Sequence, residues 1–99
     1  MPRQAPDTCR SMADLRVQID DLDRELISLL AERATYIDRA VTLKKQENLN
    51  ARITSRVEQV IANVRDQASA SDLDPDLAEA LWRTLIEWAI QREAKHIPE

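Results

Sequence analysis

The sequence predicts an all-α fold, and three observations lead to that prediction. The chain of 99 residues contains no glycine, which excludes the usual glycine turns of β-hairpins and the glycine-rich loops that bind phosphate. Its commonest residues are mostly good helix formers. Apolar residues also recur at steps of three and four from Met12 to Ala40, which is the spacing of one helix face. We expect three helices per chain, in the order long, short and medium.

The long first helix is expected from residue 11 to about residue 46. Ser11 is placed to cap it, with Asp14 at the third helical position of a variant capping box. About 35 residues at a rise of about 1.5 Å make a rod of about 50 Å, whereas a globule of this size has a radius of gyration of about 13 Å. The rest of one chain cannot cover such a rod, so we expect a homodimer. Residues 1–10 are expected to form a flexible arm, and residues 11–99 the helical domain.

The starts of the two shorter helices are marked by capping residues. Ser55 and Glu58 have the spacing of a capping box and predict the start of the second helix. Asp74 followed by Pro75 predicts the start of the third, because proline at the first helical turn loses no hydrogen bond. We expect this helix to end at Pro98.

Charge and composition exclude several classes of function. The formal net charge is −4, whereas proteins that bind nucleic acid usually carry a basic excess. Cys9 is the single cysteine and cannot form an internal disulfide, which fits a reducing compartment. No apolar run has the length of a membrane span, and the N-terminus lacks the apolar core of a signal peptide. We expect a cytoplasmic protein with neither nucleic acid nor membrane as a partner.

Cations interrupt the apolar stripe of the first helix. Arg33 follows Leu29 by four residues and Lys44 follows Ala40 by four, at positions where apolar residues are due. Arg16 flanks the same stripe nearer the start of the helix. Unpaired charges in a poorly solvated seam would cost several kcal/mol each, so either acids of the protein or a ligand must neutralise them. A small dicarboxylate would suit two arginines, since a guanidinium grips a carboxylate through two hydrogen bonds. The residue pattern leaves both outcomes open.

Motifs that extend over nearly the whole chain carry a family resemblance. In chain order they are Ala13-Asp14-Leu15-Arg16, Ile19-Asp20, Leu22-Asp23, Leu30-Ala31-Glu32-Arg33, Tyr36-Ile37, Lys44 and Leu85-Ile86-Glu87-Trp88. With these motifs, the chain from Thr8 onward resembles the small, intertwined, all-α chorismate mutases and their relatives, the isochorismate-pyruvate lyases.

The resemblance implies a dimer in which the long first helices pair and each of two sites takes residues from both chains. Arg16 would come from the partner subunit and hold one substrate carboxylate, while Arg33 would hold another from the same chain. Lys44 would lie at the ether oxygen of the enolpyruvyl group, and Arg56 would contribute from the start of the second helix. Glu93 occupies a position where many members carry a glutamine that donates a hydrogen bond to that ether oxygen. No cofactor is implied.

Three functions stay open at this stage. The favoured one is chorismate mutase, which converts chorismate to prephenate in one pericyclic step, and the spacing of twelve residues from Lys44 to Arg56 is typical of mutases. The second is isochorismate-pyruvate lyase, which gives salicylate and pyruvate; Val57 and Trp88 favour it, as does the segment Asp7-Thr8-Cys9. The third is a helical dimer without catalytic activity that binds or regulates another enzyme of the shikimate pathway.

Overall fold

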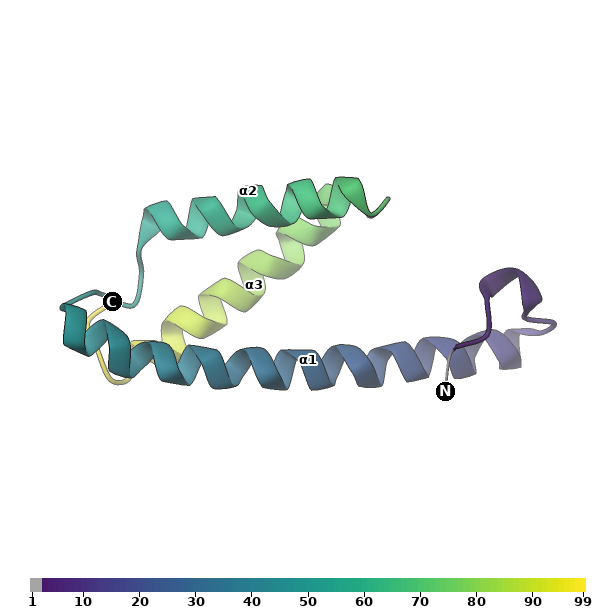
Figure 1. Cartoon of the computed structure of the whole chain (residues 1–99), viewed down its shortest axis with the longest axis horizontal. Helices are drawn as coiled ribbons and strands as arrows, with labels where there is room; N and C mark the ends of the chain where they lie inside the picture. The colour runs from purple at the N-terminus through teal and green to yellow at the C-terminus, as the bar shows by residue number, and fades with distance from the viewer. Residues whose placement is uncertain (1–2) are drawn as a thin grey trace. The chain divides into compact units, whose positions relative to one another are not determined.

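A computed structural model of the chain, in which residues 3–99 are described, confirms the all-α fold with three α-helices (Figure 1). A short 3₁₀ helix, η1 (Pro6–Thr8), precedes α1 (Met12–Glu47), α2 (Thr54–Ala70) and α3 (Pro75–Glu93). No strand is formed by residues 3–99. The chain divides into two compact units, the first ending at Thr35 and the second comprising Tyr36–Glu99. Each unit is described by itself.

Without glycine, the chain ends its first two helices with residues that tolerate a left-handed conformation. Asn48 has φ 57° directly after α1, and Asp72 has φ 57° just after α2. At the first site the amide of Leu49 donates to the carbonyl oxygen of Lys44 at 2.8 Å. At the second, the amide of Leu73 donates to Ala68 O at 2.8 Å. Both patterns are Schellman motifs, in which asparagine or aspartate takes the place of the usual glycine.

Two of the three capping residues predicted from the sequence are confirmed. The amide of Asp14 donates to Ser11 Oγ at 3.1 Å at the start of α1, and the amide of Asp76 donates to the carboxylate of Asp74 at 2.9 Å at the start of α3. The predicted Ser55 cap is wrong: α2 begins at Thr54, with Ile53 as its N-cap and no side-chain cap. No side chain of the N-cap residue therefore accepts a hydrogen bond from the first amides of α2.

The predicted end of the third helix is also wrong, because α3 stops at Glu93, five residues before Pro98. The amides of His96 and Ile97 both donate to the carbonyl oxygen of Glu93, at 3.0 and 3.1 Å, and this turns the chain. The amide of Ala51 then donates to Pro98 O at 2.8 Å. The turn lets the last residues lie along the loop between α1 and α2.

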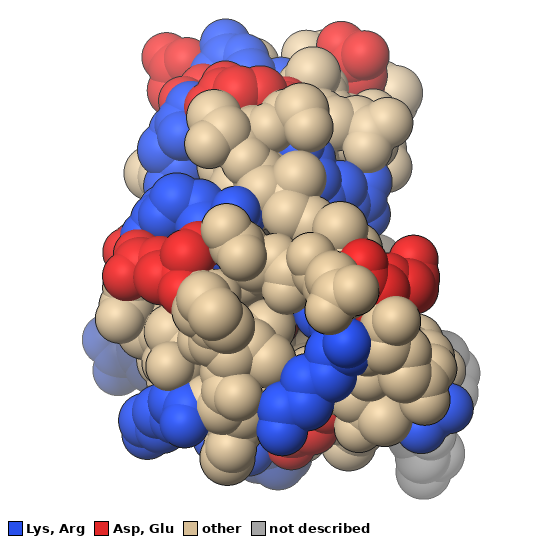
Figure 2. Space-filling view, turned by 90° about the vertical axis from the view of Figure 1, so that its left-hand side faces the viewer, with Lys and Arg blue, Asp and Glu red and all other residues tan. Residues whose placement is uncertain are grey.

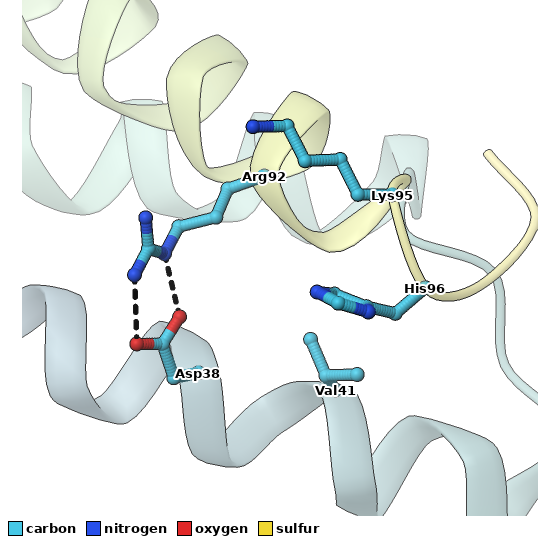
Figure 3. A pocket seen from close by; sticks show the side chains of 5 residues that line it. All are labelled: Asp38, Val41, Arg92, Lys95 and His96. Atoms are coloured by element: carbon cyan, nitrogen blue, oxygen red, sulfur yellow. Dashed lines mark hydrogen bonds and ion pairs between the residues drawn. The ribbon is translucent and has the colours of Figure 1, made fainter.

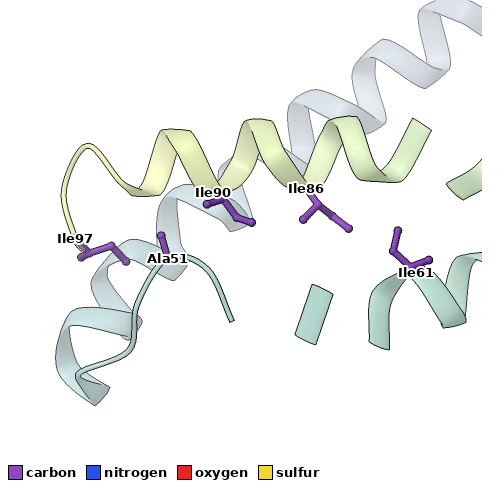
Figure 4. Packing of buried hydrophobic residues seen from close by; sticks show 5 residues of the cluster. All are labelled: Ala51, Ile61, Ile86, Ile90 and Ile97. Carbon is purple, nitrogen blue, oxygen red and sulfur yellow. The ribbon is translucent and has the colours of Figure 1, made fainter. Parts of the chain in front are cut away.

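The core of the second unit lies between α2 and α3. It also includes one residue from the loop after α1 and one from the segment after α3. Figure 4 shows its five buried members, which are Ala51, Ile61, Ile86, Ile90 and Ile97. Val41 of α1 and Trp82 of α3 pack against this cluster while partly exposed. Because α3 returns from the end of α2 toward the C-terminal part of α1 (Figure 1), residues of both helices meet beside this core.

The first unit contains the start of α1 and the segment that precedes it. Arg3 forms an ion pair with Glu25 at 2.7 Å, and the amide of Gln4 donates to Gln18 Oε1 at 2.9 Å. These contacts lie at exposed positions, and the flexibility of the arm stays a prediction; its residues 1 and 2 lie outside the described part. No residue of α1 is buried in the single chain. The apolar stripe is open instead, with Leu26 55% and Leu29 61% exposed.

Candidate active site

The second unit brings Lys44 and Glu93 together where α1 meets the end of α3. Lys44 Nζ lies 2.7 Å from Glu93 Oε1 and donates a second hydrogen bond to the carbonyl oxygen of Ala51 at 2.8 Å. The side chain of Glu93 is 4% exposed and that of Lys44 is 19% exposed. Glu93 is also the one charged or polar residue among residues 3–99 that is buried, with 3% of its surface exposed. A charge is kept at such depth only when it is paired and hydrogen-bonded, which this ammonium accomplishes.

Local structure sets the position of each of these three groups. Lys44 lies in the last turn of α1, and its own carbonyl oxygen accepts a hydrogen bond from the amide of Leu49, just after the left-handed Asn48 that ends the helix. Asn48, in its left-handed conformation, then reverses the direction of the chain. Ala51 therefore packs into the core, with 3% of its surface exposed. Glu93 ends α3 on the same side as the buried Ala89 and Ile90. The helix ends and the packing of the core together fix where these polar atoms lie.

The ammonium of Lys44 keeps one donor free for another group. A lysine ammonium has three N–H donors, and two of them are directed to Ala51 and Glu93. The side chain remains partly exposed, so an acceptor can approach from outside. The arrangement can therefore present a fixed cation to an oxygen of a small molecule, with a carboxyl group beside it.

Sequence reasoning did not find the main-chain acceptor. Ala51 carries no polar side chain, and no feature of the sequence predicts that its carbonyl oxygen meets an ammonium seven positions earlier in the chain. The path of this loop depends on the core that Ala51 joins, which local sequence does not specify.

The other three predicted site residues are arginines of α1 and α2. Arg56 is exposed in the first turn of α2 and donates to Gln59 Oε1 at 2.8 Å. Arg16 and Arg33 belong to the first unit, where Arg16 is exposed and Arg33 is half-buried. Neither arginine forms an ion pair with any part of the chain from residue 3 to residue 99. Their roles in a site stay predictions.

A second polar cluster joins the same two helices without any of the predicted site residues. Arg92 holds Asp38 through two hydrogen bonds of 2.6 and 3.0 Å (Figure 3). The hydrogen bond from Arg92 lowers the pKa of the Asp38 carboxyl below its ordinary value. The pair lines an open cavity of about 390 Å³ together with Val41, Lys95 and His96. Periodicity gave no signal for the charged members of this cluster, because they occupy exposed or half-buried positions of the helices and the turn after α3.

The surface charge does not form a field of one sign on the face where α1 ends. Figure 2 shows basic and acidic side chains side by side over that face. Several salt bridges join basic and acidic side chains of the second unit; one example is Arg52, which pairs with Glu87 at 2.8 Å and with Glu99 at 2.5 Å. The part of the chain that is described, residues 3–99, holds no cluster of three metal-binding side chains. Within the same residues, no helix is both long and apolar enough to cross a membrane.

The helical fold and the buried lysine–carboxylate pair define a small all-α protein with a fixed cation at a helix junction. The family model of chorismate mutase type II matches residues 15–94, and the chain therefore belongs to that family. This finding confirms the resemblance that the motifs indicated. Membership supports an activity of the chorismate mutase type and a substrate that resembles chorismate.

Two relatives illustrate the range of the family. The chain is 28% identical over 95 residues to an isochorismate pyruvate lyase of Pseudomonas aeruginosa (strain PAO1), a match that covers 94% of this chain and 91% of the lyase. It is 32% identical over 72 residues to a T-protein of Enterobacter agglomerans. That second match covers 73% of this chain but 19% of the T-protein, so the similarity concerns one part of a much longer protein.

Proposed function

We propose that this protein is a chorismate mutase that rearranges chorismate to prephenate without a cofactor. The observation that carries the proposal is the ammonium of Lys44, which two acceptors hold in place while one donor stays free. In this reaction the carbon–oxygen bond breaks ahead of carbon–carbon bond formation, so negative charge grows on the ether oxygen. A fixed cation at that oxygen interacts more strongly with the transition state than with the ground state, which is the requirement for catalysis.

Glu93 gives this site a dependence on protonation. Its carboxylate accepts from Lys44 in the free protein, but a second hydrogen bond to the ether oxygen requires the carboxyl group to be protonated, because an ionised carboxylate only accepts. In the protonated state Glu93 would donate to that oxygen beside Lys44. It would also no longer neutralise the ammonium, so the full positive charge would face the transition state.

The arginines would hold the two substrate carboxylates. In this proposal Arg33 binds one of them, Arg16 of the partner subunit binds the other, and Arg56 approaches from the start of α2. Such clamps keep the substrate folded with its reacting carbons close together. The absence of ion pairs at Arg16 and Arg33 within residues 3–99 supports this assignment, since both guanidinium groups remain available.

The proposed assembly is a homodimer in which the first helices pair. Its support is the open stripe of α1, where Leu22, Leu26 and Leu29 are 41%, 55% and 61% exposed. Contact with the same stripe of a second copy would remove these side chains from water. Sedimentation equilibrium tests this directly, with an expected mass about twice the 11.4 kDa of one chain. A monomer at micromolar concentration would contradict both the assembly and the shared site.

A second candidate function is isochorismate-pyruvate lyase. The match to the Pseudomonas lyase favours it, because that match extends over nearly the full length of both proteins. The lyase would use the same cations for isochorismate but would transfer a hydrogen and release pyruvate. Val57, which stands where mutases often have an acid, is compatible with this reaction.

One assay separates these functions. The purified protein is offered chorismate and isochorismate in parallel, and prephenate and salicylate are measured as products. We expect prephenate from chorismate, with a loss of kcat/KM of at least about 100-fold in Arg33→Ala because a carboxylate clamp is removed. Salicylate as the main product would favour the lyase. If neither product forms, and Arg33→Ala and Lys44→Ala change only stability, the protein is a helical binding partner instead of an enzyme.

A further inference from the structure

The segment that follows α3, residues 94–99, connects the two groups that hold Lys44. At one end, the carbonyl oxygen of Glu93 accepts hydrogen bonds from the amides of His96 and Ile97 at 3.0 and 3.1 Å. At the other end, Pro98 O accepts the amide of Ala51 at 2.8 Å. Glu93 and Ala51 are the two acceptors of the Lys44 ammonium. The segment of residues 94–99 is thus hydrogen-bonded to both Glu93 and Ala51.

The main chain of Ala51 is held on both sides. Its amide donates to Pro98 O and its carbonyl oxygen accepts from Lys44 Nζ, both at 2.8 Å. The residue is 3% exposed and packs in the same cluster as Ile97, which is 7% exposed (Figure 4). Burial of Ile97 anchors the segment, so the oxygen that faces Lys44 cannot move without loss of core packing.

A cluster of surface side chains, which we call the clamp, joins the end of the segment to the loop after α1. Its members are Arg52, Glu87, Gln91 and Glu99. The side chain of Arg52 bonds Glu99 Oε1 at 2.5 Å and Glu87 Oε1 at 2.8 Å, and its amide donates to Glu99 O at 3.2 Å. Gln91 Nε2 donates to both carboxylates, at 3.2 and 3.3 Å. The hydrogen bond from Arg52 lowers the pKa of the Glu87 carboxyl, so that the clamp is charged in the neutral range.

From these contacts we propose that residues 94–99 and their clamp on Arg52 are a positioning device for Lys44. Ile97 and Arg52 are positioning residues: within residues 3–99 neither makes a hydrogen bond or an ion pair with the Lys44 side chain, and they act by fixing Ala51 O and the turn at Glu93. If the segment were loosened, Ala51 O could move away from Lys44. The ammonium would then lose one of the two acceptors that fix its orientation. The catalytic consequence of this inference rests on the proposed function of Lys44, whereas the structural consequence does not.

The test compares Arg52→Gln with a matched control, Arg65→Gln. Both arginines bridge two carboxylates at similar exposure, with side chains 36% and 38% exposed, but Arg65 joins α2 to the start of α3 through Asp76 and Glu79. We expect Arg52→Gln to lower kcat about 3- to 10-fold with KM nearly unchanged, because misplaced catalytic groups act mainly on the chemical step. Arg65→Gln should leave kcat unchanged.

A second measurement does not depend on turnover. The ammonium protons of Lys44 are visible by NMR when hydrogen bonds slow their exchange, and the amide of Ala51 is protected while it donates to Pro98 O. Arg52→Gln should broaden the ammonium resonance and speed amide exchange at Ala51, and Ile97→Ala should do so more strongly. If Ile97→Ala does not fold by circular dichroism, Arg52→Gln decides the test.

The outcomes separate this inference from the proposed function. If the unaltered protein converts neither chorismate nor isochorismate, the proposed function fails, and the two NMR observables still decide whether the segment positions Lys44. If the protein is active, and Arg52→Gln keeps full kcat together with unchanged Lys44 and Ala51 signals, the inference is overturned.

Discussion

Substitution of Lys44 by methionine tests the buried ion pair most directly. Methionine retains much of the length and apolar volume of lysine but has no charge and no donor. The change leaves Glu93 with a side chain that is 4% exposed and, within residues 3–99, no other ion-pair partner. Ala51 O also loses the donor that it meets at 2.8 Å. The fold therefore keeps a buried carboxylate without compensation.

The expected cost follows from this burial. Removing one partner of a buried ion pair typically destabilises a protein by about 3–5 kcal/mol, because the other charge stays desolvated. With a urea m-value of about 1.5 kcal/mol/M, such a loss lowers the unfolding midpoint by about 2–3 M. The double variant Lys44→Met/Glu93→Gln should recover most of the loss, since a neutral amide is far cheaper to bury than an ion.

The assay is urea unfolding followed by circular dichroism at pH 7 and one fixed protein concentration, because any association would make stability depend on concentration. Arg92→Met is the matched control, since Arg92 also joins α1 to α3 through a carboxylate, but with side chains 42% and 52% exposed. Solvent screens that pair, so the control should change the midpoint far less. Equal effects of the two substitutions would refute the buried pair and the site built on it.

Three further predictions concern Glu93, pH and local geometry. Glu93→Gln should keep activity on chorismate if Glu93 serves as a hydrogen-bond donor to the ether oxygen, because an amide donates without being protonated; a large loss of kcat in Glu93→Gln contradicts that role. Because Arg92 lowers the pKa of Asp38 in the folded state, the pair stabilises the fold above the ordinary aspartate pKa, and this contribution is lost as the pH falls through the lowered value. Asp38→Asn should therefore reduce the loss of stability in acid unfolding, and an unchanged acid transition would count against the pair. Asn48, at φ 57°, should tolerate glycine, whereas Asn48→Ala should cost about 1 kcal/mol, as measured by thermal unfolding; equal melting temperatures would contradict the left-handed assignment.

The order and type of the helices could be predicted from local signals. Ser11 and Asp74 were correctly identified as caps, since such caps bond to amides two or three residues away and need no tertiary contact. The capping box at Ser55 failed, because α2 starts two residues earlier than that box allows, with Ile53 instead of Ser55 as its N-cap. Pro98 failed as a helix end for a different reason: the chain turns at Glu93, where the last residues gain pairing with the loop and Ile97 gains burial.

The sequence singled out Lys44 and Glu93 as candidate site residues but not their geometry, and the roles of all the predicted site residues stay predictions. Lys44 stood out because it interrupts an apolar stripe, and the family motifs added Glu93. Their separation of 2.7 Å and the carbonyl oxygen of Ala51 as a second acceptor could not be predicted. Main-chain acceptors have no sequence signature, and the approach of α3 to the end of α1 depends on packing of the whole second unit.

The sequence by itself determined an all-helical chain and the family to which it belongs, and it predicts the cations that a dicarboxylate substrate would need. These properties depend on residue type and on spacing along a helix, which local sequence encodes. Only the tertiary structure decided that Glu93 is buried against Lys44 and that the residues after α3 return to hold Ala51. Contacts of this kind form between residues about 50 positions apart, and which of them form depends on how the apolar side chains of three helices pack together.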